Sequence, residues 1–217
     1  GHAGQDALNE CMRAYGGFEH NLQSQRVVDE LEERYANFPG LNLTFETREG
    51  ILKHCSLNNA RQLGEIGERF IKRQQPSLEA QIANIADEIA YNNHDLDDGL
   101  RAELIGLKDL LQVPLFAREY EAVTRAHPDL DTRRMVHEIV RRMINYVVVD
   151  LIETTSQAIR DTAPASIADV RAASRPLVSF SEHVASEHLA LKRYLRDHVY
   201  RHYRVLRMTN KAQQVVR

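Results

Sequence analysis

The sequence predicts an all-α protein built as a helical bundle. Apolar residues recur at helical spacing along most of the 217 residues, which is the pattern expected of amphipathic helices. Glycines and prolines fall mainly between these periodic stretches, where helices end. Strand-like alternation occurs in one short stretch, LNLTFET, so we expect at most one short β-hairpin, near residues 41–47.

Four helices are predicted in the first part of the chain. They span about 3–14, about 18–36, a stretch through Ile51 and Leu52, and about 57–75. The first stops at Gly16-Gly17, because glycine readily adopts the left-handed conformation that ends helices. Thr47 is a candidate cap for the third, which competes with the hairpin for the same residues. The fourth looks like a polar surface helix or insertion that Pro76 closes.

Four further helices are predicted in the rest of the chain. They span 78–98, Pro114 to just before Pro128, 132–160 and about 181–208. Ser77 is placed to cap the first of them. The middle of the third, INYVVVDLI, is apolar almost all round, so we expect it in the core against several neighbours. The segment 161–176 is rich in Ala, Ser and Pro and predicts a linker, which would divide residues 1–160 from a C-terminal helical region, 161–217.

The helix over 78–98 is the most informative stretch because it has two organised faces. One face contains Leu78, Ile82, Ile85 and Ile89. The opposite face contains Asn84, Asp87, Tyr91 and Asp95. This polar stripe has an amide, a phenol and two carboxylates but no Lys or Arg, whereas a solvated face usually mixes charges. If it lines a bundle interior, it supplies a metal ligand and substrate contacts; an ordinary solvated face is the alternative.

Composition narrows the functional classes. The net charge is -3, from 28 basic and 31 acidic residues, so no global basic field attracts nucleic acid. Locally, basic residues and tyrosines interleave from Lys192 to Lys211, which gives either a solvated face or a phosphate- or nucleic-acid-binding surface. Cys11 and Cys55 form no CxxC pair, which favours a reducing, cytoplasmic location. No apolar run approaches the ~20 residues that cross a bilayer, so we expect no membrane contact.

Five blocks of the sequence resemble, in order and approximate spacing, one known family. The blocks are GHAGQDALN, FEHNLQSQRVVDELEERY, LTFETREGILKHC, IADEIAYNNHDLDD and YRHYRVLRM. They resemble the bacterial dGTPase-like branch of the HD-domain deoxynucleoside triphosphate triphosphohydrolases. The resemblance implies an HD-domain-type helical bundle that splits a deoxynucleoside triphosphate into deoxynucleoside and triphosphate. It also implies a divalent metal held by two histidines and two aspartates, a homo-oligomer, and single-stranded nucleic acid as a regulator.

The resemblance also implies roles for particular residues. Asp87 matches the last metal-binding aspartate, and Tyr91 and Asp95 match a substrate-contacting tyrosine and a sugar-side aspartate. The catalytic histidine matches His2, which we choose for proton transfer because imidazole titrates near neutral pH. His20 matches a second histidine near the scissile phosphate. Basic candidates for the β and γ phosphates are, by block membership, Lys53, Arg201 and Arg204.

Two departures from the family pattern affect the chemistry. Gln5 stands where the family usually has a glutamate, one turn after His2, and a neutral amide cannot favour the imidazolium by charge. We therefore expect Gln5→Glu to raise turnover. The remaining metal ligands would lie upstream of residue 1, and Asp87 alone cannot hold a catalytic ion. We expect this stretch of sequence to be inactive by itself and its longer parent to be the enzyme.

Three functional hypotheses follow from the sequence. The first is a metal-dependent hydrolase of deoxynucleoside triphosphates, dGTP-like in its substrate. The second is a catalytically silent helical module that binds nucleotide or single-stranded nucleic acid and oligomerises. A third, an HD phosphodiesterase, is disfavoured because the Asp87, Tyr91 and Asp95 stripe and the FEHN block resemble the triphosphohydrolases. Base preference stays open, and a His/Asp site suits Mn²⁺, Mg²⁺, Fe²⁺, Co²⁺ or Zn²⁺.

Overall fold

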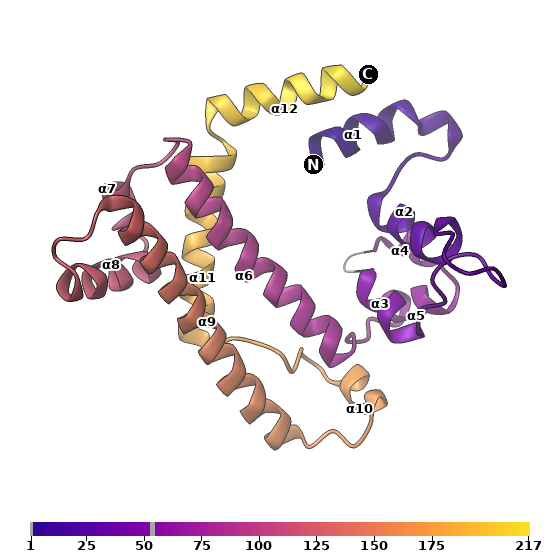
Figure 1. Cartoon of the computed structure of the whole chain (residues 1–217). Helices are drawn as coiled ribbons and strands as arrows, with labels where there is room; N and C mark the ends of the chain where they lie inside the picture. Colours follow the sequence, from indigo (N-terminus) through magenta and orange to yellow (C-terminus); the bar gives the residue numbers. More distant parts are fainter. Residues whose placement is uncertain (1, 53–54) are drawn as a thin grey trace. The chain divides into compact units, whose positions relative to one another are not determined.

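A computed structural model describes residues 2–52 and 55–217 (Figure 1). The described residues form helices and turns with no β-sheet, which confirms the all-α prediction. They divide into two compact units. Unit 1 contains residues 1–84, 163–177 and 208–217, and unit 2 contains 85–162 and 178–207. The division at residue 160 that the sequence suggested stays a prediction.

Unit 1 consists of short helices and the ends of two longer ones. They are α1 (His2–Cys11), α2 (His20–Arg26), α3 (Phe45–Ile51), α4 (Leu57–Ala60), α5 (Glu65–Lys72), the start of α6 (Leu78–Arg101), α10 (Ile167–Ala172) and the end of α12 (Tyr203–Val216). α1 ends at Cys11, earlier than predicted, and a 3-10 turn (Arg13–Tyr15) follows it before Gly16 and Gly17, both at positive φ. Gly67 lets α5 approach α4 closely, because a Cβ at this position would lie 1.8 Å from the carbonyl oxygen of Ala60.

A buried ion cluster joins three helices of unit 1. Glu49 on α3 is fully buried, and its Oε1 lies 3.0 Å from Nε of Arg69 on α5. Its Oε2 accepts a hydrogen bond of 3.2 Å from Nη2 of Arg171 on α10. The Arg69 guanidinium also donates to the carbonyl oxygen of Leu52. Buried charges are tolerated when they are paired in this way.

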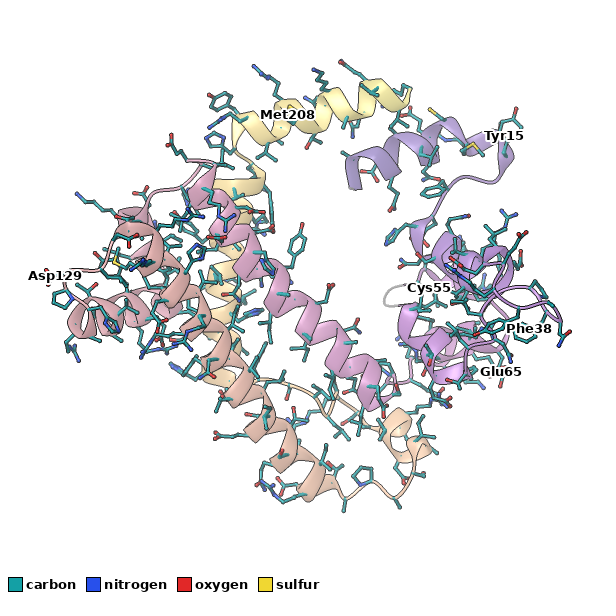
Figure 2. The ribbon with its side chains drawn as sticks, viewed as in Figure 1. Tyr15, Phe38, Cys55, Glu65, Asp129 and Met208 are labelled. Atoms are coloured by element: carbon teal, nitrogen blue, oxygen red, sulfur yellow. The ribbon has the colours of Figure 1, made fainter. Side chains whose placement is uncertain are left out.

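The prediction of a β-hairpin near residues 41–47 is wrong. Residues 41–44 connect elements, and Phe45 begins α3, with the Thr44 side chain accepting from the Thr47 amide as N-cap. The chain reverses earlier, where the amide of Gly40 donates to the Glu32 carbonyl at 2.9 Å. This reversal also ends the second helix, which passes from α2 into a π-helical turn (Val27–Leu31) and stops before the expected residue 36. Figure 2 shows Phe38 at the tip of the resulting loop.

Unit 2 is a bundle of longer helices. It contains the rest of α6, α7 (Leu107–Leu110), α8 (Pro114–Ala126), α9 (Thr132–Thr162), α11 (Glu182–Leu195), a π-helical turn (Arg196–Tyr200) and the start of α12. The predicted bounds of α8 and α9 are confirmed, and Asp129 lies in the turn between them (Figure 2). Charged side chains tie these helices together, because Arg118 on α8 contacts Glu187 on α11 at 3.0 Å, and Glu119 contacts Arg142 on α9 at 3.0 Å.

Two expectations about these helices need correction. The middle of α9 is not buried all round, since Val147 and Leu151 face the core whereas Val149 and Ile152 are 44% and 59% exposed. The terminal helix is not continuous over 181–208, because a five-residue π-helical turn follows α11 and the helical pattern breaks before Tyr203 begins α12. Across the described ranges, no helix is both long and apolar enough to span a bilayer.

Candidate functional site

The candidate site centres on α6, whose N-terminus is capped as predicted. The hydroxyl of Ser77 accepts from the Ala80 amide at 3.2 Å. The predicted apolar face is only partly correct, because Ile89 is buried but Ile82 is 49% exposed. In the unit 2 part of α6, the buried stripe consists of Ile89, Asn92, Asn93, Leu96 and Gly99. Two asparagines therefore occupy core positions, which a count of apolar residues does not detect.

Hydrogen bonds explain how these asparagines are accommodated. The Asn93 amide donates to the Ile89 carbonyl at 2.8 Å. Nδ2 of Asn92 lies 3.1 Å from Nε2 of His188 on α11, and a hydrogen bond joins them. His188 is 4% exposed, packs 5.1 Å from the Phe180 ring and lies 3.7 Å from a carboxylate oxygen of Glu88. Burial lowers the pKa of His188, which favours the neutral imidazole.

The predicted polar stripe lies beside these buried residues. Asp87 is exposed, Tyr91 is 55% exposed and Asp95 is half-buried. They follow one another at one-turn intervals of α6, as the spacing predicted. Their assignments to metal, substrate and sugar remain predictions.

Tyr200, at the end of the π-helical turn, completes a cluster with two of these residues. Its hydroxyl donates to Oδ2 of Asp95. Its ring lies 6.3 Å from the ring of Tyr91, centroid to centroid. Burial and the adjacent Asp95 carboxylate raise the pKa of Tyr200 far above its usual range, so the phenol keeps its proton and remains a donor. Burial also raises the pKa of Asp95, although the hydrogen bond from Tyr200 opposes this shift.

The two arginines predicted to hold phosphates come soon after Tyr200, Arg201 as the next residue and Arg204 in the first turn of α12. Both side chains are exposed. Nη1 of Arg201 lies 3.2 Å from Oδ1 of Asp197. Arg204 donates from Nη1 to the carbonyl oxygen of Ala102, just after α6, at 3.0 Å. Each arginine is therefore held within unit 2 by one contact and keeps other donors for a ligand.

The remaining candidates belong to unit 1. Gln5 is half-buried on α1, and His20 is exposed at the first position of α2. Nδ1 of His20 lies 3.1 Å from Glu19, whose carboxylate also caps α2 by accepting from the Leu22 amide. Glu19 is thus an orienting residue that sequence reasoning missed, although it stands in the FEHN block. The His2 side chain and Lys53 lie outside the described residues.

A complete metal site is not formed by the residues that the structure describes. Among them, no three His, Cys, Asp or Glu side chains gather closely enough to hold an ion. Asp87 is a suitable hard oxygen ligand, but one carboxylate gives neither affinity nor defined geometry. The residues in hand therefore do not fit a whole divalent-metal centre.

Comparisons with known proteins show which family this helical chain resembles. Residues 178–217, which include Tyr200, match the phosphohydrolase-associated domain HD_assoc. Over the whole chain, sequence identity is 64% to a deoxyguanosinetriphosphate triphosphohydrolase-like protein of Bordetella pertussis. It is 62% and 55% to proteins of the same description from Ralstonia nicotianae and Nitrosomonas europaea.

These matches identify the family. Each covers 100% of this chain, which spans 57%, 56% and 58% of the length of the three relatives. The chain belongs to the deoxyguanosinetriphosphate triphosphohydrolase-like proteins of the HD-domain hydrolases.

Proposed function

We propose that this chain is part of a metal-dependent deoxynucleoside triphosphate triphosphohydrolase. The reaction would convert a dGTP-like substrate to deoxynucleoside and intact triphosphate. The observation that carries the proposal is the acidic and phenolic stripe on α6, with Asp95 held by Tyr200, in a chain 64% identical to a protein described as triphosphohydrolase-like. The description of that relative as triphosphohydrolase-like supports the reaction class, and the stripe supports the substrate.

The sugar subsite follows from the chemistry of the substrate. A 2′-deoxynucleoside 5′-triphosphate has one free sugar hydroxyl, on C3′. Asp95 can accept from that hydroxyl, and hydrogen bonds to an ionised acceptor are stronger than neutral ones. Tyr91, a residue that is 55% exposed, offers an aromatic ring one turn earlier on α6.

The phosphate side of the site would use cations and imidazoles. Arg201 and Arg204 have exposed guanidiniums that match phosphate oxygens, and Lys53 is proposed to assist them. His20, oriented by Glu19, would lie near the scissile phosphate, and His2 would protonate the departing 5′ oxygen.

A divalent ion such as Mn²⁺ or Mg²⁺ would neutralise phosphate charge when bound. Asp87 is the one described residue that we propose as its ligand. The other ligands would come from parts of the longer family proteins that this sequence does not contain. We also propose a cytoplasmic location, which the free thiols of Cys11 and Cys55 support, and a homo-oligomer.

The alternative of a silent nucleic-acid-binding module has weaker support. Two cations of the expected basic surface, outside the proposed phosphate site, are paired with carboxylates: Lys192 with Glu88, and Arg196 with Asp197. These pairs reduce the free positive charge that would attract a phosphate backbone. Single-stranded nucleic acid as a regulator stays a proposal from the family resemblance.

The test is a product analysis of the complete protein. Incubation with each of the four dNTPs and Mn²⁺ or Mg²⁺ should give deoxynucleoside and inorganic triphosphate in equal amounts, and Asp87→Asn should abolish both. Glu79→Gln, which removes an exposed carboxylate from the first turn of the same helix, should retain activity. Release of pyrophosphate, or nucleotide binding without turnover, would contradict the proposed reaction, and the second outcome would favour the binding module.

A further inference from the structure

The contact between Tyr200 and Asp95 joins two segments that are far apart in sequence. Asp95 is on α6, whereas Tyr200 ends the π-helical turn after α11 and lies in the segment that matches the phosphohydrolase-associated domain. Both side chains are half-buried in unit 2. The π-helical turn matters here because its extra residue changes the direction in which the following side chains point.

The hydrogen bond from Tyr200 engages one of the two carboxylate oxygens of Asp95 and leaves the other for a ligand. Oδ2 accepts from the Tyr200 hydroxyl. Among the described residues, none donates a hydrogen bond to Oδ1, which is left to accept from a ligand. A carboxylate on two rotatable bonds would otherwise have to be ordered when the ligand binds, at a cost in free energy.

We propose that Tyr200 is the positioning residue of the sugar subsite. Its hydroxyl fixes the Asp95 carboxylate so that Oδ1 accepts the C3′ hydroxyl of the deoxyribose, and its ring lies beside that of Tyr91. The C-terminal segment 178–217 thereby contributes to the recognition of substrate and does more than pack on α6. This inference rests on the proposed function, because it assigns the support of the same sugar contact.

The test compares dGTP with 2′,3′-dideoxy-GTP, which lacks only the C3′ hydroxyl. In the complete protein, Tyr200→Phe should raise KM for dGTP about tenfold while KM for the dideoxy substrate changes less than about twofold. The preference for dGTP should therefore collapse with little change in kcat. Within an Asp95→Asn background, Tyr200→Phe should have almost no further effect, since the two residues act as a pair.

Tyr194→Phe is the matched control. Tyr194 lies on α11 and is 7% exposed, and no described residue shares a hydrogen bond with its hydroxyl. This variant should keep the wild-type preference. If Tyr200→Phe lowers the melting temperature, 3-fluorotyrosine at position 200 provides a second variant: it retains ring and hydroxyl and should preserve the preference.

The outcomes separate the two proposals. An active enzyme whose dGTP preference is equal in wild type, Tyr200→Phe and Tyr194→Phe would overturn the role of Tyr200 and leave the proposed function intact. Loss of the preference in the fluorotyrosine protein would also overturn it. A complete protein that hydrolyses no dNTP, and that binds deoxyguanosine and 2′,3′-dideoxyguanosine equally by equilibrium dialysis, would remove the proposed function and this inference together.

Discussion

Glu49 offers the sharpest test of what holds unit 1 together. Its side chain is fully buried between two guanidiniums, with Arg69 at 3.0 Å and Arg171 at 3.2 Å. Charges about 4 Å apart attract by about 4 kcal/mol at an effective dielectric constant near 20, which offsets their loss of hydration. Glu49→Gln keeps the shape but leaves two positive charges unpaired. Breaking a buried pair in this way costs about 3 to 5 kcal/mol.

Urea unfolding measures this cost directly. With a slope of about 2 kcal/mol/M, the loss corresponds to a fall in midpoint of about 1.5 to 2.5 M. Glu68→Gln is the control, because Glu68 forms an exposed pair with Lys72 on the same helix, α5, and exposed pairs contribute about 0 to 1 kcal/mol. If both variants lose the same small amount, the cluster is not a structural tie between α3, α5 and α10.

Three further predictions test backbone packing, pH dependence and catalysis. Gly67→Ala should destabilise the protein by more than about 1 kcal/mol in thermal melts, because its Cβ would lie 1.8 Å from a carbonyl oxygen. Gly4→Ala is the control: Gly4 has open space around it, so this variant should be neutral or stabilising in the same melts. Burial lowers the pKa of His188 below 6.5, so near this pH the unfolded state binds more protons than the folded state. The free energy of unfolding should therefore be highest above pH 6.5 and fall as the solution is acidified. His188→Gln should make the free energy of unfolding less dependent on pH between roughly pH 5 and 7. Gln5→Glu should raise kcat of the complete protein by about tenfold or more if a carboxylate helps His2 to donate a proton, whereas Gln214→Glu on α12 should not change kcat.

Local signals in the sequence predicted several elements well. Pro114 and Pro128 bracket α8, and Ser77 caps α6 as its position before an amphipathic stretch suggested. These signals depend on residues within a turn or two of each other, so one sequence contains them fully. The same reasoning failed where distant residues decide the outcome. The reversal at Gly40 needs contact with the π-helical turn at Val27–Leu31, which no local pattern specifies.

The candidate site shows the same limit. Helical spacing correctly placed Asp87, Tyr91 and Asp95 on one side of α6. It did not predict that Asn92 and Asn93 lie in the core, and it could not predict the hydrogen bond between Asp95 and Tyr200. Polar residues enter the core when specific partners satisfy them, and here the partner of Asn92 is 96 residues away. Tyr200 was visible only as part of the YRHYRVLRM block.

These long-range pairs explain why the segment after α9 matters to a stripe on α6. Three residues of α6 make polar contacts with α11 and the π-helical turn: Glu88 with Lys192 and His188, Asn92 with His188, and Asp95 with Tyr200. A helix turns by about 100° per residue, so a slip of one position would remove all three partners at once. The contacts therefore fix the rotation of α6 about its own axis, and with it the direction in which Asp87 and Tyr91 are presented. Apolar packing alone would specify this rotation less strictly, because apolar contacts are not directional.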